Sequence, residues 1–276
     1  MSVASIPVDV LNPGQVFASL GFLEIADVLC TGAKGKFKEN AGKYSFEIIT
    51  DCDENPFDSV LRFIAEAEVD SIDPRNARTF PCREREANEK TWPVRFKLSN
   101  YTVELSHWCD GSSRDNFKLF AGQQVALKIV EELLYGKGKN SIGFCALWEK
   151  NNLVNDPFGA SVPDSGTLYF DPRRNWKAID AGYSPDKVKH GVCTFPIVEV
   201  LAAIGLEHAR PSIDGKKMLP IEKQRVTYAI WYDDLPPCLS RPVFAGAEIG
   251  IRSQRFYFYL GISGKIKTVE FAQEEI

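Results

Sequence analysis

Residues 12–24 of the chain read NPGQVFASLGFLE. Asparagine is a preferred N-cap, because its side-chain oxygen accepts a hydrogen bond from a free amide of the first helical turn. Proline suits the next position, since its ring presets φ and it has no amide to leave unpaired. Apolar residues then follow at Val16, Phe17, Leu20, Leu23 and Val28. These features predict a helix that begins at Pro13, after a short strand over residues 6–10.

The same Asn-Pro pair returns at Asn55 and Pro56, where it predicts a second helix. Between the two helices, residues 43–49 alternate polar and apolar side chains, which is the period of a half-buried strand. Two more strands are expected at 94–98 and 101–105, beyond a charged loop at 73–90. A third helix is expected from about residue 121 through residue 133. The Gly-Lys-Gly-Lys segment at residues 136–139 is expected to end it.

The second half of the chain changes from helical to strand patterns. Residues 151–191 are rich in Asn, Asp, Pro and Gly and read as turns, and a fourth helix is expected over residues 196–208. Asp214-Gly215 then indicates a hairpin turn, and residues 225–232, 255–260 and 265–271 are expected to be strands.

These elements predict an α+β fold with mixed or antiparallel sheets, packed helices and a β-rich C-terminal part. The order of elements in the first half is compatible with a ferredoxin-like (RRM-like) core. We expect an N-terminal α+β region over residues 1–150 and a C-terminal region with one helix and a β-rich end over 151–276. A length of 276 residues also allows a single domain.

The composition is that of a folded protein, with 44% hydrophobic and 25% charged residues. A net charge of −4 argues against a protein that coats nucleic acid alone, but permits a local contact within a larger assembly. No apolar stretch reaches the roughly 20 residues of a membrane span, and the N-terminus lacks a secretory signal pattern. We therefore expect a cytoplasmic protein that does not bind membranes.

Seven cysteines, an odd number, are scattered along the chain without a CxxC pair, and there are only three histidines. A disulfide framework or zinc site normally shows paired spacing, so neither is expected, and the cysteines are predicted to be buried thiols. Common nucleotide-binding, acyl-transfer and metalloprotease motifs are also absent from the sequence. We expect no metal, no cofactor and no catalytic residue, with His107, His190 and His208 as the remaining candidates for a general base.

Short basic clusters with aromatic neighbours are the candidates for nucleic-acid contact, since guanidinium and ammonium groups bind phosphates and aromatic rings stack on bases. Solvated surface is the alternative for each cluster. The clusters comprise Arg173, Arg174 and Lys177 beside Trp176; Lys216 and Lys217 with Lys223 and Arg225; Arg252 and Arg255 beside Tyr257; and Lys265 with Lys267.

Lys118, Gln123 and Gln124 precede or open the predicted third helix. Free amides and the helix dipole at such an end attract a phosphate. Capping of the helix end by a glutamine side chain explains the same residues equally well.

Four blocks of the chain, taken in order, resemble CRISPR-associated proteins encoded with type I-U effectors, now called type I-G. The blocks are residues 12–24 (NPGQVFASLGFLE), 120–124 (FAGQQ), 169–174 (YFDPRR) with 180–186 (DAGYSPD), and 195–206 (FPIVEVLAAIGL). The resemblance covers the chain to about Pro211, and the remaining residues match only loosely.

This resemblance implies a non-catalytic subunit of a Cascade-like surveillance complex, in which guide RNA reads the target and protein subunits hold the nucleic-acid backbones. It implies other effector subunits, CRISPR RNA and target DNA as partners. It also implies phosphate contacts from Lys118, Gln123, Gln124, Arg173 and Arg174. Two alternatives remain: a CRISPR RNA-processing endoribonuclease that uses a histidine, and a subunit that only bridges other proteins.

Overall fold

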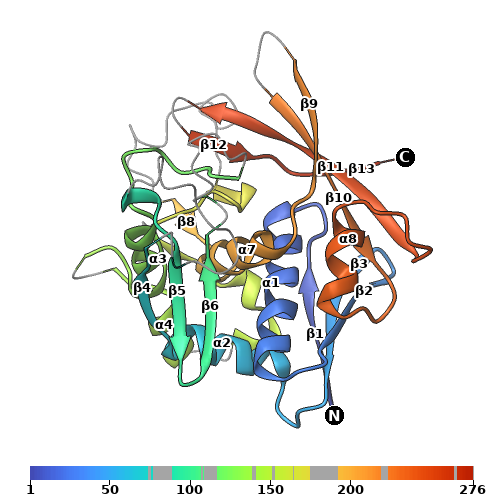
Figure 1. The fold of residues 1–276 in the computed structure, drawn as a ribbon, viewed down its shortest axis with the longest axis horizontal. Coiled ribbons are helices and arrows are strands. Elements are labelled where there is room, and N and C mark those ends of the chain that lie inside the picture. Colours follow the sequence, from blue (N-terminus) through green and yellow to red (C-terminus); the bar gives the residue numbers. More distant parts are fainter. Residues whose placement is uncertain are drawn as a thin grey trace.

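The computed structural model describes residues 1–73, 76, 89–106, 108, 117–138, 141–150, 153–163, 165–174, 192–218, 223–263 and 266–275. Two helices, α1 (Pro13–Leu29) and α7 (Pro196–His208), lie in the middle of the molecule with small antiparallel sheets on either side of them (Figure 1). The predicted α+β class is confirmed.

Helix α1 begins where the Asn-Pro pair predicts. The Asn12 side chain accepts a hydrogen bond from the Gln15 amide at 3.3 Å, and Pro13 is the first helical residue. The same arrangement opens α2 (Pro56–Glu66), where the Asn55 side chain accepts from the Phe57 amide at 2.9 Å. These caps satisfy amides that have no partner within the helix, so the two helix starts are fixed locally by sequence.

The first sheet consists of β1 (Ser2–Val8), β3 (Lys43–Thr50) and β2 (Lys34–Asn40), antiparallel and in that spatial order. Strand β3 matches the predicted alternating segment, whereas β1 lies earlier in the chain than expected and β2 was not predicted. The second sheet consists of β4 (Glu68–Ser71), β5 (Val94–Leu98) and β6 (Tyr101–Leu105). Strands β5 and β6 have the predicted bounds.

A ferredoxin-like core is not confirmed. The chain has the required order β1-α1-β2-β3-α2-β4, and β3 lies between β1 and β2 as that fold requires. However, β4 pairs with β5 of the second sheet and not with β1. Among the described strands, three of the four strands of a ferredoxin-like sheet are therefore present in the required order, and the fourth belongs to another sheet.

The middle of the chain adds helices α3 (Ala126–Tyr135) and α4 (Phe144–Lys150). Helix α3 ends at Gly136 as predicted but begins five residues later than expected, with Val125 at its cap, and α4 was not predicted. Helix α7 has the predicted bounds. The remaining short elements are η2 (Glu89–Thr91), η4 (Leu153–Asn155), η5 (Pro157–Gly159), η6 (Pro172–Arg174) and the strand pair β7 (Val162–Pro163) and β8 (Cys193–Thr194).

The C-terminal part is rich in strands, as predicted. One sheet contains β12 (Ile266–Val269), β11 (Ser253–Ser263), β10 (Lys223–Trp231) and β9 (Ser212–Met218) in that order, and β13 (Gln273–Glu274) also pairs with β11. Asp214 and Gly215 lie within β9, so the predicted hairpin turn at this point is wrong. Helix α8 (Pro237–Phe244) is a second helix of this region, which the sequence analysis did not predict.

Helices α1 and α7 cross at two glycines. A Cβ atom on Gly21 would lie 2.1 Å from the Leu201 carbonyl oxygen, and one on Gly205 would lie 2.1 Å from the Phe17 carbonyl oxygen. The helices are buried along almost their whole length, from Pro13 to Ala26 in α1 and from Pro196 to Glu207 in α7. Because the backbones touch directly, no side chain fits between the helices at this crossing.

One hydrophobic core runs through both predicted regions. Its largest fully buried side chains include Phe17 and Phe22 of α1, Phe57 of α2, and Tyr228 and Trp231 of β10. The Trp231 indole donates a hydrogen bond to the Gly35 carbonyl oxygen at 2.7 Å, which fixes the C-terminal sheet to the first sheet.

The bonding and exposure of four cysteines differ from the prediction of buried free thiols. Cys30, which follows α1, forms a disulfide with Cys52, which follows β3, and the two are separated by 22 residues in the sequence. Cys193 and Cys238 are exposed, so the prediction of buried free thiols is wrong for these four residues. Sequence spacing could not reveal the pair, because the two cysteines meet only after α1 and β3 have packed together.

Replacement of Gly205 by alanine is expected to lower the free energy of unfolding by about 3 kcal/mol, because the added Cβ overlaps the Phe17 carbonyl oxygen and forces the helices apart. Gly122→Ala is the matched control, since no atom lies within 4 Å of its added Cβ, and a change below about 0.5 kcal/mol is expected. Urea denaturation followed by circular dichroism measures both. Equal stability of the two variants would contradict the close helix crossing.

Replacement of Cys52 by serine is expected to lower the free energy of unfolding by about 3 kcal/mol under oxidising conditions, because a disulfide closing a loop of this length restricts the unfolded chain. With excess dithiothreitol, the wild type and the variant should have the same stability. A stability difference that persists in dithiothreitol would mean that the serine acts through packing and not through loss of the disulfide.

Candidate nucleic-acid interface

The C-terminal sheet has two different faces. Residues Val226 and Tyr228 of β10 and Phe256 and Phe258 of β11 point into the core. The residues between them point to the other side, because successive side chains of a strand alternate. We call this side the basic-aromatic face, and its members are Arg225 and Thr227 of β10, Arg255, Tyr257 and Tyr259 of β11, and Gln273 of β13.

The two tyrosines form the centre of the basic-aromatic face. Their ring centroids lie 6.0 Å apart in an edge-to-face arrangement, and the Arg225 guanidinium carbon lies 4.2 Å from the centroid of the Tyr257 ring. The Tyr257 hydroxyl donates to the Gln273 side-chain oxygen at 2.6 Å. All of these side chains are partly exposed or exposed, so the face combines aromatic surface with a cation held above it.

Both arginines of the face already have acidic partners. Arg225 is paired with Glu275. Arg255 donates to the Glu248 carboxylate at 2.9 Å and to the Gly246 carbonyl oxygen at 3.1 Å. A phosphate at this face would therefore share or replace a carboxylate, and such an exchange costs little at a half-exposed site.

The other predicted residues of this region lie elsewhere. Lys267 is opposite Ile262 in the β11–β12 register, which places it on the other side of the sheet from Tyr257. Its amide donates to the Leu119 carbonyl oxygen at 3.1 Å, next to Lys118. The exposed Arg252 precedes β11, and its guanidinium carbon lies 4.7 Å from the Tyr232 ring centroid.

Lys118 is buried, with a relative exposure of 7%. Its ammonium group donates to the Phe120 carbonyl oxygen at 3.0 Å and lies 4.2 Å from the Phe120 ring centroid. Burial, and then the charge of Lys267, lower the pKa of Lys118. The structure thus brings Lys118 and Lys267 together, but leaves little of the Lys118 side chain accessible to a phosphate.

Gln123 and Gln124 lie in a turn before α3 and not in its first turn. The Gln123 side-chain oxygen accepts from the Lys90 ammonium at 3.1 Å, and that of Gln124 accepts from the Ala121 amide at 3.3 Å. No side chain caps α3, so the predicted glutamine cap is wrong. Both side chains are exposed and remain accessible to a partner.

Arg173 is partly buried, with 26% of its side chain exposed. It follows the buried Asp171, whose carboxylate accepts from the Arg173 side chain at 2.6, 3.0 and 3.1 Å. The guanidinium carbon lies 3.3 Å from the Phe195 ring centroid, just before α7. Asp171 also accepts from the Asn12 side chain at 3.1 Å, so the pair connects the start of α1 with the start of α7.

Arg174 donates to the Ser165 carbonyl oxygen at 3.3 Å and lies near the buried Glu199 of α7. The Glu199 carboxylate accepts from the amides of Leu168, Phe170 and Asp171 at 2.8, 3.3 and 3.2 Å. Burial, and then the charge of Asp171, raise the pKa of Glu199 to about 7. Glu199 thus holds the segment before Arg173 against α7.

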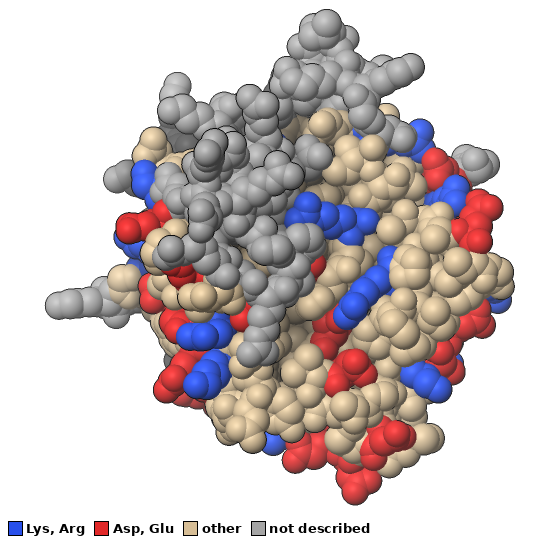
Figure 2. Space-filling model, viewed as in Figure 1, with Lys and Arg blue, Asp and Glu red and all other residues tan. Residues whose placement is uncertain are grey.

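A hollow of about 470 Å³ lies beside Arg173, between β1 and η5. Its charged wall residues are Asp9, Lys43, Asp156 and Arg173, so both signs of charge are present. Figure 2 likewise shows lysines and arginines in small separate groups, among acidic and uncharged side chains, on the face that it presents. On that face the described residues form no continuous basic groove.

Several predicted residues lie outside the described residues. These are Trp176, Lys177, Lys265, His107 and His190, together with the side chains of Lys216 and Lys217 of β9 and of Lys223 of β10. His208 is the last residue of α7 and lines a small hollow with Glu24 and Glu104. Within the described part of the chain, no group of three or more His, Cys, Asp or Glu residues is placed to hold a metal, and no helix is long and apolar enough to cross a membrane.

Comparison of the chain with models of protein families, with curated proteins and with solved structures found no match. The site is therefore described by its own geometry. Arg225, Arg255 and Tyr257 of this face were predicted from the sequence, whereas Tyr259 was not. The strand predicted over residues 255–260 contained the signal for Tyr259. Because side chains alternate along a strand, Arg255, Tyr257 and Tyr259 lie on the same side of it.

The raised pKa of Glu199 predicts that the stability of the protein depends on pH. Because its pKa is raised in the folded protein, the folded protein binds this proton more tightly than the unfolded chain, and its contribution to stability is lost as pH rises. Between about pH 5 and about pH 8, the free energy of unfolding of the wild type should fall relative to Glu199→Gln by up to about 3 kcal/mol. Denaturation curves across this range test it, and parallel profiles for the two proteins would contradict the raised pKa.

Proposed function

We propose that the chain is a non-catalytic subunit of a type I CRISPR RNA-guided surveillance complex of the I-U or I-G type. In this role it contacts the backbone of guide RNA, target DNA or both during antiviral defence. Its partners are the other effector subunits, CRISPR RNA and target DNA. The protein contributes binding surface and does not break bonds.

The spatial arrangement of the blocks that resemble the type I-G family supports this proposal. Asn12 of the first block bonds to Asp171 of the third, and Arg173 stacks on Phe195 of the fourth. Gly21 of the first block packs against Leu201 of the fourth. Three of the four blocks, which are distant in sequence, thus meet in one connected centre.

The basic-aromatic face is the observation that carries the proposal. Tyr257 and Tyr259 offer adjacent rings on a sheet, and unpaired bases stack on such rings with little dependence on base identity. Arg225 and Arg255 lie on the same face within reach of a backbone that follows the bases. A guide RNA presents single-stranded regions of this kind, so the face suits a subunit whose sequence information comes from base pairing.

The double substitution Tyr257→Ala and Tyr259→Ala is expected to weaken binding of single-stranded RNA at least about tenfold, because each lost base stack is worth about 1–3 kcal/mol. Fluorescence anisotropy with a fluorescein-labelled RNA of mixed sequence measures the affinity. Arg225→Gln should weaken binding to a smaller extent and reduce its dependence on salt.

Tyr135→Ala is the matched control, because Tyr135 is 53% exposed on α3 and lies away from the C-terminal sheet. It should leave RNA binding unchanged. Equal RNA affinity of the wild type and the double variant would exclude the basic-aromatic face as the nucleic-acid site. Equal loss of affinity in the double variant and in the Tyr135→Ala control would mean that the loss is not specific to the basic-aromatic face.

A further inference from the structure

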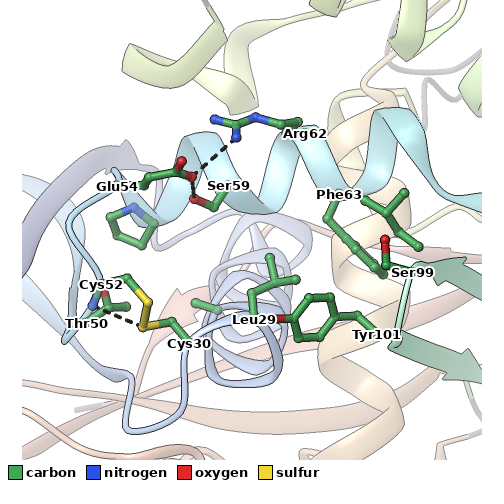
Figure 3. A pocket seen from close by; sticks show the side chains of 13 residues that line it. Leu29, Cys30, Thr50, Cys52, Glu54, Ser59, Arg62, Phe63, Ser99 and Tyr101 are labelled. Carbon is green, nitrogen blue, oxygen red and sulfur yellow. Dashed lines mark hydrogen bonds and ion pairs between the residues drawn. A yellow bond between two sulfur atoms is a disulfide. The ribbon is translucent and has the colours of Figure 1, made fainter.

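A further surface hollow, of about 400 Å³, lies at the end of the molecule where α1 ends. Its floor comes from the last turns of α1 and from Phe63 of α2, and one wall comes from the β5–β6 turn. The Cys30–Cys52 disulfide forms part of the opposite wall (Figure 3). The volume falls within the range of sites that enclose a small molecule or one large side chain.

The hollow is lined mainly by apolar groups. Tyr101 is 40% exposed, and Figure 3 shows its ring pointing toward Leu29 across the floor. The Pro56 ring and the two disulfide sulfurs complete the lining. Sulfur atoms and aromatic rings attract one another, and aromatic rings pack edge to face with tyrosine and phenylalanine. An aromatic ring therefore fits the chemistry of the hollow better than an aliphatic chain.

The rim of the hollow is acidic. The exposed loop after β3 carries Asp51, Asp53 and Glu54, and Asp58 follows in the first turn of α2. Arg62 is the basic side chain of the lining, and it is bound by both Glu54, at 3.3 Å, and Asp58, at 2.7 Å. Asp53 also pairs with the α-amino group of Met1 at 3.3 Å.

The surface around the hollow is negatively charged, as the rim is. Two cations, the Arg62 guanidinium and the Met1 amino group, oppose these four carboxylates, of which Glu54 lines the hollow itself. The excess of negative charge beside the hollow therefore favours a cation at its mouth. Acidic side chains also gather along the lower edge of the face in Figure 2, at the end of the molecule where the chain begins (Figure 1). An anionic ligand would be repelled from this end, which separates the hollow in its chemistry from the basic-aromatic face.

We propose that this hollow is a docking site for a segment of a partner protein in which an aromatic side chain, best a tryptophan, is flanked by lysine or arginine. The aromatic ring enters between Tyr101 and the disulfide, and the flanking cations lie against Asp51, Asp53 and Glu54. Buried aromatic anchors with a charged rim are the usual arrangement of binding energy at protein interfaces. This docking site does not depend on RNA binding, so its test can fail or succeed whatever the outcome of the test of the proposed function.

The test uses a fluorescein-labelled peptide, Lys-Arg-Trp-Arg-Lys, blocked at both ends, with fluorescence anisotropy at low salt. We expect the purified full-length protein to bind this peptide at least tenfold more tightly than the Trp→Ser peptide and than Glu-Glu-Trp-Glu-Glu. Equal affinity for the tryptophan and serine peptides would overturn the proposal, since it would reduce binding to a charge effect. Absence of binding would also overturn it.

Two variants of the protein locate the site. Ser59→Trp on α2 places an indole in the hollow and should weaken peptide binding at least tenfold, whereas Ser5→Trp on the exposed side of β1 should not. Tyr101→Ala removes the ring at the mouth without filling the hollow and should also weaken binding. Wild-type affinity in both Ser59→Trp and Tyr101→Ala would place the peptide elsewhere.

The rim is tested by charge reversal. Asp51→Lys should weaken binding of the basic peptide several-fold, and the difference from the wild type should shrink as salt is added. Asp233→Lys is the matched control, because Asp233 is also exposed but follows β10, whereas Asp51 lies between the lining residues Thr50 and Cys52. Equal loss of affinity in both variants would mean that the peptide responds to the overall charge of the protein and not to this rim.

Discussion

The contact between α1 and α7 through Gly21 and Gly205 is the constraint on which the rest of the structure depends. It brings two almost fully buried helices together, and the sheets then pack around the pair. Buried carboxylates on these helices hold the surrounding segments. Glu24 pairs with Arg241 of α8 at 2.6 and 2.7 Å, and Glu207 accepts from the backbone and hydroxyl of Ser106 after β6 at 2.7 and 2.5 Å. Each of these carboxylates is satisfied by donors, which a buried charge requires.

Local signals in the sequence predicted the elements that depend on local physics. The Asn-Pro caps predicted the starts of α1 and α2, alternation predicted β3, and strand-like composition predicted β5 and β6. Strand β2 was missed because Lys34, Lys36 and Lys38 alternate with few apolar residues, and its register comes from pairing with β3. Helix α8 was missed because Pro242 lies inside it. The order of strands in the sheets, the disulfide and the pairing of β4 with β5 instead of β1 depend on contacts between distant segments. No local sequence pattern encodes such contacts.

The candidate site was predictable to a smaller extent. Arginine beside aromatic residues is a fair signal for nucleic acid, but the same pairing also builds protein interiors. Arg173 illustrates this, because Asp171 and Phe195 hold its guanidinium at the junction of α1 and α7. At Arg225 and Tyr257 the same pair lies on the side of a sheet that faces away from the core. Only the fold distinguishes the two cases, and it divides the predicted residues into a structural group and a surface group.

The most direct test of the account is whether the protein enters a ribonucleoprotein assembly of defined mass. The chain is co-expressed with the neighbouring effector proteins and a CRISPR RNA, and the product is separated by size exclusion and weighed by native mass spectrometry, with and without the RNA. The account predicts stable incorporation into a ribonucleoprotein of defined mass that is lost or depleted when the RNA is omitted. A monomer that ignores both the effector proteins and the RNA would contradict it.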